Sequence, residues 1–181
     1  MKASTGILAV ALVAAAFFIG RYLYQQPRFV NGDSGPNFSA PMANGETFEL
    51  TDLRGQYVLV DFWGSWCAPC LQAIPELKAL YADYHDRRYT DAKNFELLSV
   101  GVETDPARWR QALERLQLPW PYQVLDHTTS ARFFDSPLAA QYGITAVPTT
   151  YLLDPGGQII GVNLSFPELR KLLDRRLAEA G

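Results

Sequence analysis

The sequence has few of the side chains that build metal sites or disulfide scaffolds. Its 181 residues include two cysteines, two histidines and two methionines. A tetrahedral zinc site needs four ligands. There is no second cysteine pair, and His85 and His127 stand alone in polar stretches, so we predict no metal site. The chain also lacks an excess of positive charge, since its net charge is −3. A nucleic-acid partner would require a basic face, so none is predicted.

The two cysteines stand together in the segment Trp66-Cys67-Ala68-Pro69-Cys70. The apolar run 57–63 before them is typical of a buried strand, and the leucine and isoleucine spacing after them is typical of a helix. A disulfide that closes so short a loop removes little entropy from the unfolded chain. A purely structural role is therefore disfavoured, and the pattern predicts a redox switch that opens and closes one small disulfide.

The position at the start of a helix explains why these thiols would react. A thiolate, not a thiol, attacks a disulfide. The first turn of a helix has unpaired N–H groups and the positive end of the helix dipole, which favour an anion. Pro69 suits this turn because it has no N–H to leave unpaired. We therefore expect Cys67 to be the exposed nucleophile and the more covered Cys70 to be the resolving thiol.

The amino terminus carries the longest apolar run. Residues 6–20 are uncharged, with Lys2 before them and Arg21 behind them. We expect residues 1–24 to be an uncleaved, single-pass membrane anchor, because bulky residues stand where a signal peptidase would need small ones. A cleaved signal peptide is the alternative. Residues 25–35 would be a linker, and residues 36–181 the domain, on the extracytoplasmic (periplasmic) side of the cytoplasmic membrane.

The domain is expected to alternate strands and helices. Strands are predicted at 47–50, after an Asn44-Gly45 hairpin turn, and at 57–62, 95–102, 122–125, 149–153 and 158–162. Helices are predicted from Cys70 to about residue 84, from 105 to about 117, from 136 to about 143, and from 165 onward. This order implies an α/β fold with a central mixed sheet, whose last two strands form an antiparallel hairpin. Function in such sheets lies at the carboxyl ends of the strands, where Cys67 falls.

Asp61 is a charged residue in the middle of an apolar strand. A buried carboxylate costs several kcal/mol unless it is neutral or paired. Desolvation would raise its pKa, which would let it exchange a proton with Cys70. An exposed position on an edge strand is the alternative.

These motifs resemble the thioredoxin superfamily. The resemblance lies in WCAPC after VDFW, in Val147-Pro148-Thr149 and in the DPGG hairpin at 154–157. The extra amino-terminal hairpin and the expected anchor are similar to the TlpA/ResA/CcmG branch of membrane-anchored thiol:disulfide oxidoreductases. The sequence alone would leave Val147–Pro148 trans, since only ~5–6% of X–Pro bonds are cis.

The resemblance implies roles for particular residues. It implies that Pro148 is cis and faces Cys67, that a substrate strand pairs with the backbone of Val147, and that Asp61 is the buried proton acceptor. It also implies that Pro75 kinks the helix. We therefore predict Cys67, Cys70, Asp61 and Pro148 as catalytic residues, and Trp66, Ala68, Pro69 and Val147 as substrate-binding residues. The redox-active Cys67–Cys70 disulfide would be the redox group, with no further cofactor.

Two positions depart from this pattern or extend it. Many relatives used in cytochrome c maturation carry a glutamate three residues after the second cysteine, where this chain has Ala73. Glu103 ends a predicted strand, and we expect it to be a solvated charge at the rim of the site, with a role in the site as the alternative.

The function predicted from these residues is disulfide reduction in protein substrates, recharged by a membrane electron donor, with a possible place in cytochrome c maturation. The same site running in reverse, as a thiol oxidase or disulfide isomerase, is one alternative, and a non-catalytic thioredoxin-like binding module is another. Peroxide reduction, as in peroxiredoxins, is disfavoured because Gly64 occupies the position of their threonine.

Overall fold

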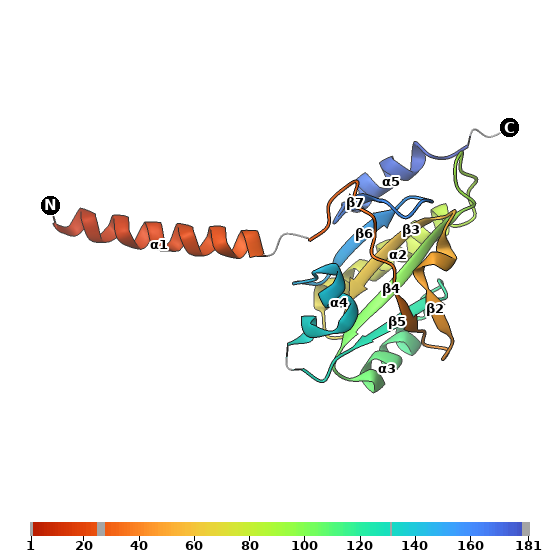
Figure 1. Cartoon of the computed structure of the whole chain (residues 1–181), viewed down its shortest axis with the longest axis horizontal. Coiled ribbons are helices and arrows are strands. Elements are labelled where there is room, and N and C mark those ends of the chain that lie inside the picture. Colours follow the sequence, from red (N-terminus) through yellow and green to blue (C-terminus); the bar gives the residue numbers. More distant parts are fainter. Residues whose placement is uncertain (1, 25–27, 131, 179–181) are drawn as a thin grey trace.

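The computed structural model describes residues 2–24, 28–130 and 132–178. Its centre is a five-stranded sheet in the order β5–β4–β3–β6–β7 (Figure 1). The strands are β3 (Tyr57–Trp63), β4 (Phe95–Glu103), β5 (Tyr122–His127), β6 (Thr149–Leu153) and β7 (Ile159–Val162). β3, β4 and β5 are parallel, whereas β6 runs antiparallel to β3 and to β7. The predicted mixed sheet with a terminal antiparallel hairpin is confirmed.

Helices and a small hairpin cover both faces of this sheet. Helices α2 (Ala68–Tyr84) and α5 (Phe166–Asp174) pack on the side chains of Leu59 and Leu97. The neighbouring residues Val58 and Val60 point to the opposite face. That face is covered by α4 (Pro137–Tyr142), the hairpin β1 (Ser39–Pro41) and β2 (Thr47–Glu49), and the 3₁₀ turn η1 (Leu50–Leu53). Every residue of β3 and β4 is buried as a result, which explains their nearly continuous apolar sequence.

Two further elements follow the carboxyl ends of the parallel strands. They are α3 (Pro106–Leu116), which follows β4, and the 3₁₀ turn η2 (Phe133–Asp135), which follows β5. β5 extends to His127, two residues beyond the predicted end. The extension buries Asp126, whose carboxylate accepts hydrogen bonds from the Ser136 hydroxyl and from the backbone N–H groups of Leu138 and Ala139. The sequence pattern did not predict this extension. A charged residue normally indicates the end of a buried strand, unless the hydrogen-bond partners that allow its burial are known.

Two helix boundaries differ from the prediction. α2 begins at Ala68, with Cys67 as its N-cap, and continues through Pro75 to Tyr84; the kink at Pro75 stays a prediction. α5 ends at Asp174, before Leu177. Leu177 instead forms an isolated bridge with Tyr89 and still packs on the α2–α5 core.

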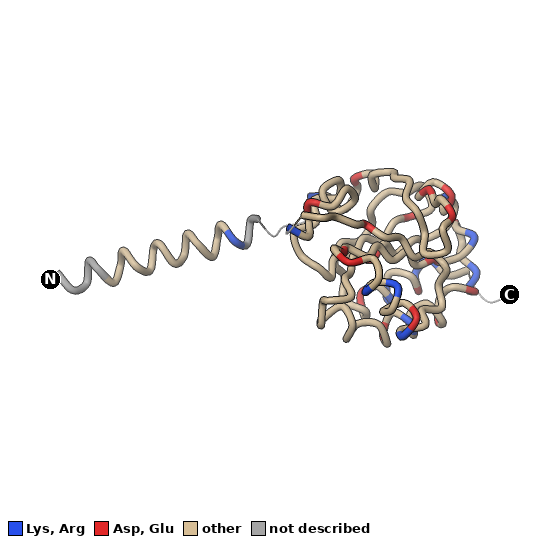
Figure 2. Tube along the Cα trace, turned by 90° about the horizontal axis from the view of Figure 1, so that it is seen from below, with Lys and Arg blue, Asp and Glu red and all other residues tan. Residues whose placement is uncertain are grey.

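The amino-terminal helix α1 (Lys2–Tyr24) is one continuous helix. Its side chains are described for residues 7–21, where they are exposed and carry charge only at Arg21 (Figure 2). Within the described part of the chain, no helical stretch combines the length and hydropathy that a membrane crossing needs. The expected transmembrane helix is thus not supported among the described residues.

The expected linker, 25–35, lies partly outside the described residues, at 25–27. Its last residues run along the edge of the sheet. Gly32 and Gly35 donate backbone hydrogen bonds to the carbonyls of Ile159 and Gly157, at 2.8 and 3.0 Å. Ser34 forms an antiparallel bridge with Gln158 between them.

Candidate active site

The Cys-x-x-C segment lies where β3 ends and α2 begins. Cys67 and Cys70 form a disulfide with a Cα–Cα distance of 5.3 Å. Cys67 is the N-cap of α2, and its Sγ accepts the backbone N–H of Cys70 at 3.2 Å. When the disulfide is reduced, this N–H and the helix dipole face a thiolate on Cys67. The predicted placement of the nucleophile at the helix start is confirmed.

The expected exposure of Cys67 is wrong for the oxidised site. Cys67 is 4% exposed and Cys70 is 2% exposed. Both sulfurs belong to a small apolar cluster with Trp63, Trp109 and Ala112. The neighbours Ala68 and Pro69 are exposed. The exposed residues Ala68 and Pro69 therefore lie beside a nearly covered sulfur.

The Val147–Pro148 peptide bond is cis, as the resemblance implied. The carbonyl oxygen of Val147 lies 3.6 Å from the Sγ of Cys67. Thr149 begins β6 immediately afterwards, and its hydroxyl donates to the carbonyl of Ala146 at 2.8 Å. The fold thus brings Val147 against the sulfur of Cys67, although the two residues are 80 positions apart in the chain. Pairing of a substrate strand with Val147 stays a prediction.

Asp61 is buried in the middle of β3, as predicted, where it lies between Ser99 of β4 and Thr150 of β6. Burial alone raises its pKa from 3.8 to about 7. This value is suitable for a group that takes up and releases a proton near neutral pH.

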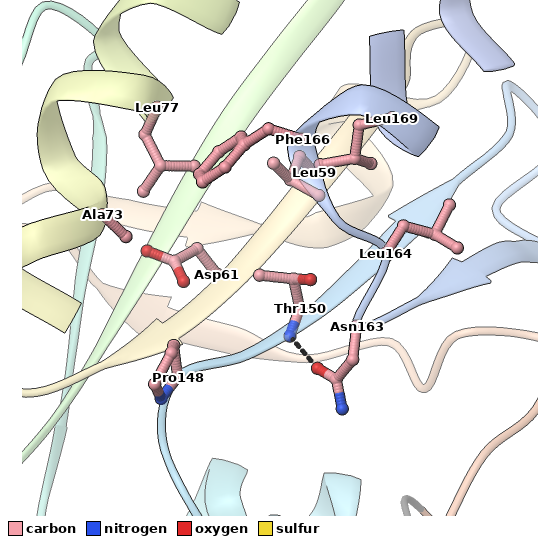
Figure 3. A pocket seen from close by; sticks show the side chains of 10 residues that line it. All are labelled: Leu59, Asp61, Ala73, Leu77, Pro148, Thr150, Asn163, Leu164, Phe166 and Leu169. Atoms are coloured by element: carbon pink, nitrogen blue, oxygen red, sulfur yellow. Dashed lines mark hydrogen bonds between the residues drawn. The ribbon is translucent and has the colours of Figure 1, made fainter. Parts of the chain in front are cut away.

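A cavity of about 240 Å³ opens beside Asp61. Figure 3 shows the Asp61 carboxylate pointing toward Ala73 of α2, with Pro148 below. The other lining residues are Leu59, Leu77, Thr150, Asn163, Leu164, Phe166 and Leu169. Asp61 is the one titratable residue of this lining. Ala73 stands where many cytochrome c maturation relatives carry a glutamate, so the lining holds a single carboxylate, that of Asp61.

Trp66 is half-buried and held from two sides. Its Nε1 donates to the carbonyl of Val102 at 2.9 Å. Its ring centroid lies 4.5 Å from that of Phe133 and 6.5 Å from that of Phe134, both of η2. Sequence reasoning missed these two rings, although an aromatic pair inside a polar loop was a usable signal. A Cβ on Gly64 would lie 2.6 Å from the Trp66 ring, so the threonine of peroxiredoxins has no room there.

Glu103 is not the solvated rim charge that we expected. It is 1% exposed, and its carboxylate accepts the backbone N–H of Ser65. Burial raises the pKa of Glu103, and the hydrogen bond from Ser65 partly opposes that rise. The sequence could not show this, because it does not reveal that the loop before Cys67 folds back over the end of β4.

The fold and this site define the class: a thioredoxin-like protein with a redox-active dithiol. The chain matches the model of the AhpC/TSA family over residues 31–162 and belongs to that family. It is similar to the thiol-disulfide oxidoreductase ResA of Bacillus subtilis, at 28% identity over 87% of this chain and 81% of the relative. It is 31% identical to ResA of Geobacillus thermodenitrificans, over 86% of this chain and 82% of the relative.

A solved structure shares the fold as well. The thiol-disulfide oxidoreductase from Bacteroides fragilis superposes with a TM-score of 0.63 at 34% identity, covering 77% of this chain and 99% of that one. The Cys67–Cys70 pair and these relatives make the chain a thioredoxin-like thiol:disulfide oxidoreductase.

Proposed function

We propose that this chain reduces disulfides in protein substrates on the extracytoplasmic side of the membrane. The observation that carries the proposal is the Cys67–Cys70 disulfide at the start of α2, with the Sγ of Cys67 3.6 Å from the Val147 carbonyl. A reactive sulfur beside the backbone of the half-buried Val147 suits an extended polypeptide, which can pair with backbone groups, rather than a small molecule.

The reaction proceeds in two exchanges. The Cys67 thiolate attacks one sulfur of the substrate disulfide, forms a mixed disulfide and releases the other substrate sulfur as a thiolate. The Cys70 thiolate then attacks the Sγ of Cys67, closes the Cys67–Cys70 disulfide and releases the second substrate thiol. Two electrons pass to the substrate, and a donor dithiol restores them by the reverse sequence.

Asp61 takes the proton that Cys70 must lose before the second exchange. Its carboxylate is buried, and its pKa of about 7 makes the ionised form available at neutral pH. Because Ala73 supplies no second carboxylate to the same cavity, Asp61 acts alone. The absence of a glutamate at that position is also why we do not extend the proposal to cytochrome c maturation.

The direction of the reaction rests on two sequence features. A proline before the second cysteine and a tryptophan before the first resemble reducing thioredoxins, and a reductase outside the cytoplasm needs a donor in the membrane. The membrane electron donor and the extracytoplasmic location are both parts of this proposal. The reverse direction, thiol oxidation, uses the same residues and is the alternative that a reduction potential tests.

Trapping of substrates tests the proposed mechanism. A reduced Cys70→Ser chain, incubated with disulfide-containing proteins, should accumulate mixed disulfides through Cys67 that dithiothreitol releases. A Cys67→Ser chain is the control and should trap none. If Cys70→Ser traps nothing while the wild-type chain reduces the same proteins, the two-step exchange is wrong.

A further inference from the structure

A second hollow, separate in its lining from the cavity beside Asp61, lies against the loop before Cys67. It has a volume of about 180 Å³. One wall is Ser65; the others are Arg108, Gln111, Ala112 and Arg115 of α3. These four α3 positions are spaced i, i+3, i+4 and i+7, so they share one face of the helix.

Ser65 gives this hollow an unsatisfied polar group. The residue is 5% exposed, and its hydroxyl makes no well-aligned hydrogen bond within the described structure. The hydroxyl does lie close enough to the Glu103 carboxylate to help lower the pKa of Glu103, and the backbone N–H of Ser65 donates to the same carboxylate. A buried hydroxyl with only a poorly aligned partner is unfavourable. A ligand that accepts a hydrogen bond from the Ser65 hydroxyl would complete the site.

The α3 wall supplies donors and positive charge. Arg108, Gln111 and Arg115 are exposed at the surface. In residues 2–24, 28–130 and 132–178, neither arginine has an ion-pair partner within 4.0 Å. Glu103 is close enough for the positive charge of Arg108 to lower its pKa, and the Asp105 carboxylate accepts the backbone N–H of Arg108. The positive charge of Arg108 is therefore partly balanced by the carboxylate of Glu103. The positive charge of Arg115 is available to attract an anion.

The hollow shares one lining residue with the apolar cluster that contains the two sulfurs. Ser65 stands two residues before Cys67, and Ala112 packs in the same apolar cluster as Cys67 and Cys70. A group bound here therefore lies beside the disulfide rather than at a remote surface.

We propose that the hollow formed by Ser65, Arg108, Gln111 and Arg115 binds a carboxylate of the substrate, namely an acidic side chain close to the disulfide that is reduced. This inference rests on the proposed function, because it assigns a substrate class to the same site. Guanidinium groups pair with carboxylates through parallel hydrogen bonds, and the Gln111 amide and Ser65 hydroxyl add uncharged donors. The subsite selects disulfides flanked by Asp or Glu.

The test compares two cystine peptides that differ only by Glu or Gln near the disulfide. The reduced full chain is mixed with each peptide, and the second-order rate constant of peptide reduction is measured at low salt. We expect the Glu peptide to react about fivefold faster, as one partly exposed, charge-assisted contact allows. Arg115→Gln should reduce this ratio to about one. Arg110→Gln removes the same charge from α3 outside the hollow and should keep the ratio.

Sulfate distinguishes a substrate carboxylate from a free anion. Added sulfate should slow the Glu peptide to the rate of the Gln peptide, at an ionic strength held constant with chloride. If sulfate slows both peptides alike, the hollow is a site for free anions and the substrate assignment is wrong. Equal rates for both peptides, or equal losses in Arg115→Gln and Arg110→Gln, would also overturn it. If neither peptide is reduced, the proposed function itself fails.

Discussion

The carboxylate of Glu103 accepts the backbone N–H of Ser65, two residues before Cys67. The adjacent carbonyl of Val102 accepts the indole N–H of Trp66. The end of β4 thus holds the loop before the nucleophile through two consecutive residues. Since Glu103 touches neither sulfur in this arrangement, its role is to position the loop.

Replacing Glu103 tests this positioning role. Glu103→Ala leaves the Ser65 N–H buried without a partner, and we expect a loss of about 1–3 kcal/mol in the free energy of unfolding. Glu103→Gln keeps an acceptor oxygen and should recover most of that stability. Denaturant unfolding of the oxidised chain measures both values. Equal losses in the two variants would show that the hydrogen bond is not what stabilises the loop.

Asp61 should make stability depend on pH. Burial raises its folded-state pKa from 3.8 to about 7. A raised carboxyl pKa means that the folded state holds its proton more tightly than the unfolded state. The contribution of Asp61 to stability is therefore highest below about pH 4, falls as the pH rises to about 7, and is constant above that.

Asp61→Asn removes this slope. At pH 8 it should stabilise the oxidised chain by about 2–4 kcal/mol, and at pH 4 it should have little effect. Denaturant unfolding at both pH values provides the measurement. Glu114→Gln, which changes an exposed carboxylate on α3, is the control and should shift neither value. A stabilisation equal at pH 4 and pH 8 would contradict the assignment of the pH dependence to Asp61.

The same variant should impair catalysis. With no carboxylate to accept the Cys70 proton, Asp61→Asn should lower turnover of a protein disulfide at pH 7 at least about tenfold. Wild-type turnover should rise with pH up to about 7 as Asp61 ionises, and the variant should lack that rise. Trapping by a Cys70→Ser chain, which needs only the first exchange, should proceed equally with or without Asp61→Asn. Loss of trapping would mean that Asp61 acts before the step we assign to it.

Gly64 is required by the position of Trp66. A Cβ at residue 64 would lie 2.6 Å from the indole, so Gly64→Ala must displace the ring from Phe133 and from the Val102 carbonyl. We expect a loss of about 1–3 kcal/mol in the free energy of unfolding. Gly156→Ala, where the new Cβ lies 3.3 Å from the Asp154 oxygen that accepts the N–H of Gln158, should cost less, at most about 1 kcal/mol. Equal losses of stability in Gly64→Ala and Gly156→Ala would show that the Trp66 ring moves aside without a cost in stability.

Local patterns predicted most of the fold because its central strands are buried on both faces. The runs at 57–62, 95–102 and 149–153 stand out as apolar segments, and the burial of Asp61 follows from its apolar neighbours. The cis bond at Pro148 did not follow from the residues themselves but from the resemblance to thioredoxins.

What the sequence did not predict depends on contacts between distant segments. Glu103 is buried because the loop at 64–66 covers the end of β4, and Trp66 is held by Phe133 from a turn 67 residues away in the chain. Cys67 is covered because α3 and the loop before β6 close over the disulfide. The helix α1 illustrates a different limit: its apolar composition indicated a membrane span, which the described residues do not support.

The reduction potential of the Cys67–Cys70 couple tests the central claim most directly. The full chain is equilibrated with glutathione buffers, and the fraction of disulfide is measured by thiol alkylation. We predict a value near −270 mV or lower, as for thioredoxin, because a reductase must give electrons to substrate disulfides. A value near −120 mV, as for a strong thiol oxidant, would contradict the account and assign this site to disulfide formation.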